Sequence, residues 1–194
     1  MLIPVTALFV MKRSIYKSLN ASCYDIDRDA RTFDMSTPVV AHPPCRSWGR
    51  LRKFAKPLDG ESELAVMAVN IVRRCGGVLE HPDGSILFEQ LNMKKSSSSD
   101  VYGGFFLSVD QFWWGHKARK KTILYICGCS MSDLPAFPLR FDAIQYVVSG
   151  SKQGGKKEIS KADRERTPIG FARWLIEVAM MCKPNQDFFF NKIL

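Results

Sequence analysis

The chain has 194 residues, of which 46% are hydrophobic and 24% charged, and its formal net charge is +9. This length suits one domain with a sizeable core, and the composition excludes a disordered or fibrous chain. No apolar run reaches the roughly 18 residues that a membrane span needs. An excess of lysine and arginine favours a polyanionic partner, because neutralising phosphates releases counterions, although basic residues also serve solubility alone. We expect a nucleic acid or a nucleotide as the partner and no membrane.

The six cysteines include no C-x-x-C pair, and no second cluster is present to close a structural zinc site. Reduced thiols are the expected state, which indicates a cytoplasmic protein. The apolar N-terminus, M-L-I-P-V-T-A-L-F-V, has no preceding basic residues and contains a proline. We therefore interpret it as a first strand and not as a signal peptide.

The first half of the chain predicts a strand–helix–strand unit. Residues 5–10 and 38–41 have the apolar character of strands, and residues 60–74 have apolar positions at helical spacing. Gly76 and Gly77 end this helix, and a further strand starts at Val78. Strand, helix and strand in this order are typical of a parallel sheet.

The second half is more irregular. Residues 92–104 are polar and predict a surface loop, residues 109–114 predict a short strand, and residues 122–127 form the clearest strand of the chain. A basic flexible loop is expected around residues 149–162. A closing helix is expected around residues 168–181, with Thr167 as its N-cap and Pro168 at its first position. The whole pattern predicts a single α/β domain over residues 1–194, with a Rossmann-like, mostly parallel sheet flanked by helices.

Three histidines each stand beside an expected strand end, in A-H-P-P-C (His42), L-E-H-P (His81) and G-H-K-A-R-K-K (His116). Groups at the carboxyl ends of strands converge on the ligand crevice of an α/β sheet. Cys45, Glu80 and the basic segment should therefore meet in one site.

The residue types in these motifs suggest attack on a pyrimidine ring. A cysteine held by two prolines beside Arg46 is expected to have a lowered pKa and to act as a nucleophile. A partly desolvated Glu80 can hold or donate a proton, and a guanidinium can bind a carbonyl oxygen or a phosphate. Addition of the thiol to C6, with protonation of N3, would make C5 nucleophilic.

In order along the chain, these motifs resemble those of the cytosine-C5 DNA methyltransferases. Pro43-Pro44-Cys45 resembles the family's Pro-Pro-Cys motif, and Glu80-His81-Pro82 resembles its Glu-Asn-Val motif. Residues 117–121, followed by T-I-L-Y-I, resemble its Gln-x-Arg-x-Arg motif that leads into a strand. The chain is also similar to small phage and bacterial proteins that combine A-H-P-P-C, L-E-H-P and G-H-x-A-R-K and are described as methyltransferase-like. The resemblance covers about residues 5–127.

The resemblance implies a reduced class I methyltransferase-like fold and modification of cytosine at C5, in DNA or in a nucleotide. Cys45 would be the nucleophile, Glu80 the partner of N3 and Arg119 the anchor of the ring carbonyl or the phosphate. The implied substrate-binding residues are Pro43, Pro44, Arg46, Trp48, His81, His116, Lys117 and Lys121. S-adenosylmethionine is the implied cofactor, and the residues expected to bind it are Phe9, Asp25, Asp27 and His42.

Two features depart from the family. The family's glycine-rich turn after the first strand is replaced by A-L-F-V-M-K-R-S-I-Y, and residues 128–161 are too few for a region that reads base sequence. Two other functions therefore stay open: a non-catalytic factor that binds nucleic acid or protein on a degenerate methyltransferase scaffold, and a thiol-dependent nucleotide-modifying enzyme without S-adenosylmethionine. Two alternatives for single residues also stay open. Cys45 and the three histidines could bind zinc, and Trp48 could stack on a base or belong to the core.

Overall fold

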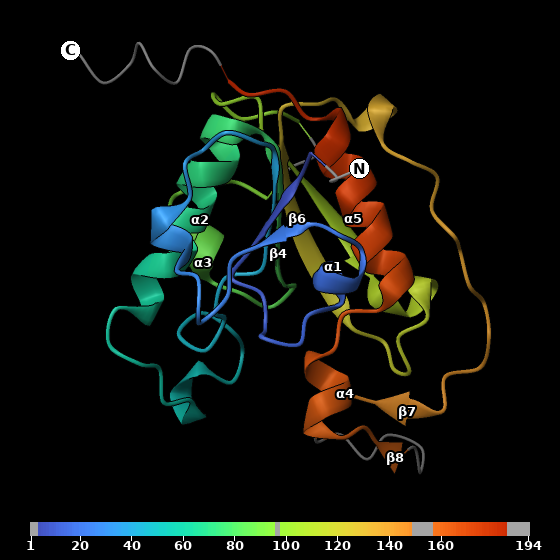
Figure 1. Ribbon diagram of the computed structural model, residues 1–194. Helices are drawn as coiled ribbons and strands as arrows, with labels where there is room; N and C mark the ends of the chain where they lie inside the picture. The colour runs from blue at the N-terminus through green and yellow to red at the C-terminus, as the bar shows by residue number, and fades with distance from the viewer. Residues whose placement is uncertain (1–3, 96–97, 149–156, 186–194) are drawn as a thin grey trace.

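The computed structural model describes residues 4–95, 98–148 and 157–185, and its centre is a six-stranded sheet in the order β2-β1-β3-β4-β6-β5 (Figure 1). The strands are β1 (Thr6–Leu8), β2 (Ser22–Cys23), β3 (Val39–Ala41), β4 (Gly77–Pro82), β5 (Phe105–Asp110) and β6 (Lys121–Cys127). The pairs β1–β2, β1–β3 and β3–β4 are parallel, whereas β6 runs antiparallel to both of its neighbours. The predicted α/β class with a mostly parallel sheet is confirmed.

Helices cover both faces of the sheet (Figure 1). α2 (Glu61–Cys75) and α3 (Leu87–Gln90) pack on one face, and α1 (Ile15–Ser18) and α5 (Ile169–Met181) pack on the other. α4 (Lys161–Glu165) and the small sheet of β7 (Tyr146–Val147) and β8 (Lys157–Glu158) lie beside the main sheet. Four short 3₁₀ helices complete the described elements: η1 (Ala30–Thr32), η2 (Arg52–Phe54), η3 (Gln111–Trp114) and η4 (Met131–Asp133). Within the described ranges, no helix has both the length and the apolar character needed to cross a bilayer.

The β3–α2–β4 unit forms as the sequence predicts, and it sets the register of the sheet. The apolar stripe of α2 is buried against the sheet, and its members are Ala65, Ala68, Val69, Ile71 and Val72. Gly76 and Gly77 follow the helix with φ of 74° and 126°. A Cβ atom at Gly77 would lie 2.1 Å from the carbonyl oxygen of Val39. Only glycine therefore allows β4 to start this close to β3.

Two details of the sequence prediction are wrong, and a third is only partly tested. The strand expected at residues 109–114 ends at Asp110, because the Asp110 carboxylate accepts a hydrogen bond from the amide of Phe112 and starts η3. Thr167 is not the N-cap of the closing helix: Pro168 is still extended, with ψ of 141°, and the helix begins at Ile169. The loop expected around residues 149–162 is only partly tested, since residues 149–156 lie outside the described residues. In the rest, residues 157–158 form β8 and Ser160 caps α4.

Candidate active site

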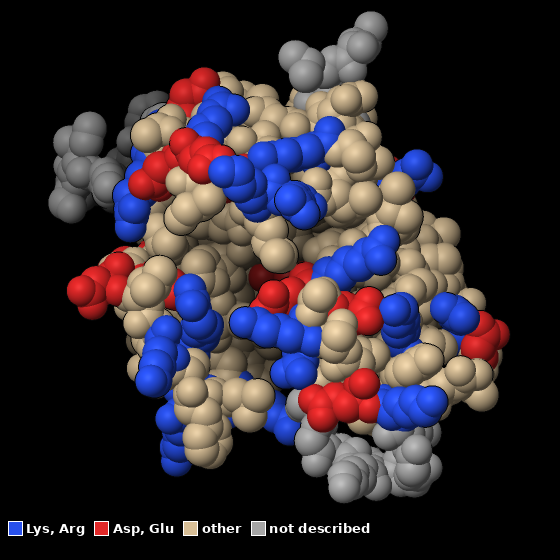
Figure 2. Space-filling view, turned by 60° about the horizontal axis from the view of Figure 1, so that its bottom comes forward, with Lys and Arg blue, Asp and Glu red and all other residues tan. Residues whose placement is uncertain are grey.

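The carboxyl ends of β1, β3 and β4 meet at one edge of the sheet. From β1 the chain first adds β2 on one side and then β3 on the other, so the strand order reverses between β1 and β3. In open α/β sheets this is where ligands bind, outside the carboxyl ends of the strands. Figure 2 shows that face: it is hollowed near its middle, with acidic side chains in the hollow and lysine and arginine around it.

The parallel register brings His42 and Glu80 together at this edge. Val39 pairs with Gly77 and Ala41 with Leu79, so the next residues along the two strands are His42 and Glu80. The Nδ1 atom of His42 lies 3.0 Å from Oε2 of Glu80, and the two side chains are only 13% and 14% exposed. The pair is therefore a direct extension of the ladder between β3 and β4.

Two further side chains complete a chain of hydrogen bonds around this pair. The hydroxyl of Tyr16, from α1, lies 2.9 Å from Nε2 of His42. The amide nitrogen of Gln111, from η3, donates to Oε1 of Glu80 at 3.2 Å and to the hydroxyl of Thr122 at 3.0 Å. Each carboxylate oxygen of Glu80 thus has one partner, and these two partners come from separate parts of the chain.

These contacts decide the charge of Glu80. Burial by itself raises the pKa of this carboxyl, because it disfavours the charged form. The hydrogen bond and the charge of His42, together with the positive charges of Lys120 and His81, outweigh burial and lower the pKa of Glu80 to about 2. At neutral pH Glu80 is therefore an ionised hydrogen-bond acceptor in the free protein.

Cys45 lies in the turn that follows β3, where its carbonyl accepts hydrogen bonds from the amides of Trp48 and Gly49 at 3.1 and 2.8 Å. The residue is exposed at the surface. Even so, burial of its sulfur and then the negative charge of Glu80 raise the pKa of the thiol, and Lys120 partly opposes them. The expectation of a lowered pKa at Cys45 is wrong. Cys45 nevertheless follows the strand that pairs with the strand of Glu80, and the Glu80 charge contributes to the raised pKa of the thiol.

Arg46 does not support the thiol as the sequence suggested. Its guanidinium pairs with the buried carboxylate of Glu61 at the start of α2, at 2.7 Å for Nε and 2.6 Å for Nη2. This pair anchors the turn after Cys45 to the helix. Of the two prolines before the thiol, Pro43 is buried and Pro44 half-buried. The described structure therefore gives Arg46 and Pro43 positions within the scaffold of the turn.

The third motif lies at the same edge, but the structure presents a different cation from the one expected. Arg119 is 65% exposed and faces Asp110, with Nε 3.8 Å from the carboxylate. Lys117 pairs with Asp163 at 3.0 Å, and Lys121 is exposed. The cation whose charge acts on both Cys45 and Glu80 is instead Lys120.

His116 is a structural residue in this fold. The ring is 4% exposed, and its nitrogens contact the main chain of Ala118 and the carbonyl of Asp163 at 2.7 and 3.1 Å. Burial lowers the pKa of His116, so the ring is neutral at physiological pH. Its contacts join the segment before β6 to α4. The structure thus does not place His116 against Cys45 or Glu80.

His81 and Trp48 lie on the opposite face of β4 from Glu80. The His81 ring is fully buried, and it meets Phe88 edge-on with centroids 6.2 Å apart. Burial lowers the pKa of His81 to about 4, although the charge of Glu80 and the carbonyl of Pro44 oppose this effect. Within the described residues, neither ring nitrogen of His81 forms a hydrogen bond of ordinary geometry, and neither does Nε1 of the half-buried Trp48. Trp48 packs against the core cluster under α2 and leaves one polar atom unsatisfied.

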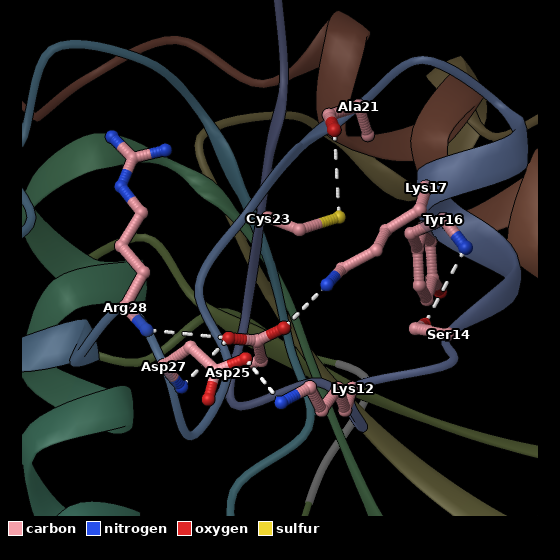
Figure 3. A network of polar contacts seen from close by, with 9 residues as sticks. All are labelled: Lys12, Ser14, Tyr16, Lys17, Ala21, Cys23, Asp25, Asp27 and Arg28. Atoms are coloured by element: carbon pink, nitrogen blue, oxygen red, sulfur yellow. Dashed lines mark hydrogen bonds and ion pairs between the residues drawn. The ribbon is translucent and has the colours of Figure 1, made fainter.

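The residues expected to bind S-adenosylmethionine come from the ends of β1, β2 and β3, and two of them, Asp25 and Asp27, contact each other and nearby lysines (Figure 3). Phe9 has φ of 58°, so a side chain occupies a left-handed turn where a glycine was expected. Asp25 accepts from the Lys17 ammonium and from the amides of Asp27 and Arg28. These acceptors would have to be released before they could bind a ribose.

Two more residues of the expected cofactor set are also engaged. The Asp27 carboxylate pairs with Lys12 at 2.8 Å, and His42 belongs to the Glu80 pair described above. A backbone turn with a Cβ atom and paired carboxylates do not fit the open cradle that the cofactor needs.

The zinc alternative is not supported. The three histidines contact Glu80, Phe88 and the main chain near α4, so each has different surroundings. Across residues 4–95, 98–148 and 157–185, no group of three or more His, Cys, Asp or Glu side chains could hold a metal ion.

Sequence reasoning missed three residues of the site: Tyr16, Gln111 and Lys120. Lys120 belongs to the basic run that was recognised, but the neighbouring residue was chosen. Gln111 directly precedes the aromatic cluster, where a polar side chain could have indicated a strand end. Tyr16 lies in a four-residue helix that gives no periodic signal.

Neither a protein-family model nor a curated protein matches this chain. The function must therefore be argued from the geometry of the site itself.

Proposed function

We propose that the chain is a pyrimidine-modifying enzyme that activates C5 of the ring through covalent addition of Cys45 to C6. The observation that carries this proposal is that Cys45, in the turn after β3, and Glu80, on the paired strand β4, share the carboxyl edge of the sheet, where the carboxylate charge raises the pKa of the thiol. A nucleophile and a proton-carrying group on one edge are what this addition needs. Lys120 adds a positive charge that acts on both groups.

The chemistry follows from the ring. The sulfur of Cys45 loses its proton and forms a bond to C6, and the π electrons of the ring move toward N3. N3 gains a proton beside Glu80, and C5 becomes an enamine-like carbon that can take up an electrophile. A cytosine in duplex DNA would have to be flipped out of the stack to reach Cys45.

The resemblance suggests a methyl group from S-adenosylmethionine as the electrophile and cytosine as the base. The paired carboxylates around β1 and β2 favour the related alternative, in which the same thiol chemistry serves another donor. Both versions share the addition to C6, so one experiment tests them together.

The test is exchange of the C5 hydrogen for deuterium in D₂O, followed by NMR on dCMP, on dUMP and on an oligonucleotide. Thiol addition makes C5 exchangeable without any donor. We expect wild-type protein to exchange at least one of these substrates and Cys45→Ser to lose exchange. Cys129→Ser is the matched control, because this half-buried cysteine follows β6 and contacts Cys182. Unchanged exchange in Cys45→Ser would contradict the proposal. If the wild-type protein exchanges and Cys45→Ser does not, addition of S-adenosylmethionine tests whether a methylated product forms.

One observation favours a second function, nucleic-acid binding without catalysis. In the segment after Cys45, Leu51, Phe54 and Leu58 are 58%, 86% and 68% exposed. The same segment carries the cations Arg50, Arg52, Lys53 and Lys56. Cations combined with an exposed aromatic ring suit a single strand, because bases stack on the ring and phosphates contact the charges.

This second function predicts oligonucleotide binding that weakens steeply with salt and is unchanged in Cys45→Ala. Phe54→Ala should weaken it by roughly 1–3 kcal/mol, the usual worth of one stacked base. Fluorescence anisotropy at several salt concentrations measures both effects. Binding that is lost in Cys45→Ala would contradict the purely non-catalytic function.

A further inference from the structure

We propose that His42, positioned by Tyr16, supplies through Glu80 the proton that the pyrimidine N3 takes up. The inference rests on the proposed function, since it explains how an ionised carboxylate can serve as the acid of that reaction. His42 does not contact the substrate in this scheme. It is a positioning residue that acts through Glu80.

The hydrogen bonds assign the tautomer of His42. Burial, and then the charge of Glu80, raise the pKa of Tyr16 well above its ordinary value, so its hydroxyl keeps its proton. That hydroxyl can donate to Nε2 of His42 at 2.9 Å. Nε2 is then the acceptor, and the ring proton is on Nδ1, 3.0 Å from Oε2 of Glu80. A neutral His42 therefore directs its N–H at the carboxylate.

Glu80 cannot be the original source of the proton. Both of its oxygens accept hydrogen bonds, Oε2 from His42 and Oε1 from Gln111. A carboxylate that accepts on both oxygens is stabilised in its charged form. The carboxylate must therefore receive a proton before it can give one to N3, and His42 is the titratable donor in hydrogen-bond contact with it within the described residues.

The proton balance closes over one addition. His42, whose side chain is 13% exposed, takes a proton from solvent on Nε2, and the Tyr16 hydroxyl turns from donor to acceptor of that hydrogen bond. The Nδ1–H proton passes to Oε2 of Glu80, and the carboxyl then protonates N3 while the sulfur of Cys45 bonds to C6. The proton of the thiol leaves to solvent. One proton enters and one leaves, so formation of the adduct does not change the total charge of protein and substrate. Breakdown of the adduct by the reverse steps restores the free protein.

Several titratable groups other than His42 lie around this relay, and their effects on the pH dependence must be distinguished from that of His42. Tyr16 comes from α1, Cys23 from β2, Cys45 from the turn after β3, and His81 from β4 itself. Lys120 precedes β6. Because Cys45 also titrates, the pH dependence of a single protein would mix two effects. A ratio between two variants that both retain Cys45 removes the thiol from the comparison.

The first test needs no turnover. Nitrogen NMR of the imidazole rings, assigned by loss of one set of signals in His42→Asn, should show His42 as the Nδ1–H tautomer. Tyr16→Phe should shift this tautomer balance toward Nε2–H. Tyr24→Phe is the matched control, because it removes another buried hydroxyl that accepts a bond from Arg28 at 2.7 Å. A free protein with the proton on Nε2 would overturn the proposal whether or not the protein is an enzyme.

The second test uses C5 deuterium exchange. His42→Asn can keep an N–H donor toward Glu80 but cannot carry an extra proton. We expect exchange to fall by about 10- to 100-fold near neutral pH, toward the low end of what acid–base groups contribute. The ratio of wild-type to variant rate should fall as pH rises, by up to tenfold per unit, because one protonation is lost. A ratio that is constant with pH overturns the relay while leaving the proposed function intact, whereas a wild type without exchange contradicts the proposed function itself.

Discussion

The two halves of the carboxyl edge of the sheet use their carboxylates in opposite ways. At the ends of β1 and β2, Asp25 and Asp27 are each paired with a lysine. At the ends of β3 and β4, Glu80 is held by a histidine and an amide, so its direct partner is a group that is charged only when protonated, and not a lysine. Polar atoms without partners also gather on this side: both nitrogens of His81, Nε1 of Trp48 and Oε1 of Gln111. The β3–β4 side is therefore the one on which we propose that a ligand binds.

The largest expected effect is on turnover, and it compares the two sides directly. Glu80→Gln should reduce C5 exchange by roughly 10²–10⁴, because it removes the carboxyl that carries the proton. Asp27→Asn, on the other side, should leave exchange unchanged, since Asp27 pairs only with an exposed lysine. Deuterium exchange followed by NMR measures both variants. Equal losses of C5 exchange in Glu80→Gln and Asp27→Asn would contradict the difference between the two sides of the edge.

Acid stability should depend on Glu80 in particular. Its pKa is about 2 in the folded protein and about 4.3 when unfolded, so the unfolded state binds the proton first. The stabilisation is present above the unfolded pKa and is lost as pH falls through 2, and it amounts to roughly 3 kcal/mol. Urea unfolding between pH 2 and 6 should show this additional loss in wild type and not in Glu80→Gln. Parallel pH curves for the two proteins would contradict the assigned charge.

His81, in contrast to Glu80, should destabilise the folded protein, because it is a buried group without a hydrogen bond of ordinary geometry. Its folded pKa of about 4 lies below the unfolded value, so stability falls as pH drops from about 6.5 to 4. His81→Leu removes this titration and two unsatisfied nitrogens, and we expect a gain of about 1–3 kcal/mol at pH 5. His116→Leu is the matched control and should lose stability, because the His116 ring is bonded to the main chain. Thermal or urea unfolding of both variants distinguishes the two cases.

A smaller effect tests whether Cys45 and Glu80 are coupled. Removing the negative charge lowers the pKa of Cys45, so Glu80→Gln should be alkylated severalfold faster at this thiol near pH 8. Mass spectrometry after timed iodoacetamide treatment measures each cysteine separately. Cys129 serves as the internal reference, because its pKa depends on Cys182 and not on Glu80. An unchanged Cys45 rate would mean that the two groups are not coupled.

The smallest effect is expected on the paired side. Lys12→Ala removes an ion pair whose side chains are 68% and 59% exposed. Such pairs contribute between about 0 and 1 kcal/mol, so the unfolding free energy should hardly change. Urea unfolding at low and high salt checks this. A loss of more than about 2 kcal/mol in the unfolding free energy would show that the ion pairs of the β1–β2 side matter as much as the contacts of Glu80.

The parts of the fold with strong local patterns could be predicted from the sequence. α2 has an apolar stripe ended by two glycines, and β6 is rich in β-branched and aromatic residues, so both were located within one or two residues. β1 and β2 have only three and two residues in the ladder, which is too short for a periodic pattern. The end of β5 depended on a single side-chain cap at Asp110, which apolar patterning cannot show.

The site was predictable where strand ends decided it. Cys45 follows β3 and Glu80 lies on the adjacent parallel strand β4, so the order of the motifs was enough to predict that both belong to one edge of the sheet. Sequence reasoning could not separate Arg119 from Lys120, whose charge acts on both Cys45 and Glu80, because successive residues of an extended chain point to opposite sides. Tyr16 could not be found, because tertiary packing of a four-residue helix delivers it to His42.

The geometry of the site depends on Gly77, although this residue does not belong to the site. It lies three residues before Glu80, which is roughly 10 Å along the strand, and faces the carbonyl of Val39 with no room for a methyl group. Replacing it would push β4 away from β3 at the far end and misalign His42 with Glu80 at the near end. A genetic screen for inactive protein should therefore recover Gly77 among its hits, although this residue would never touch a substrate.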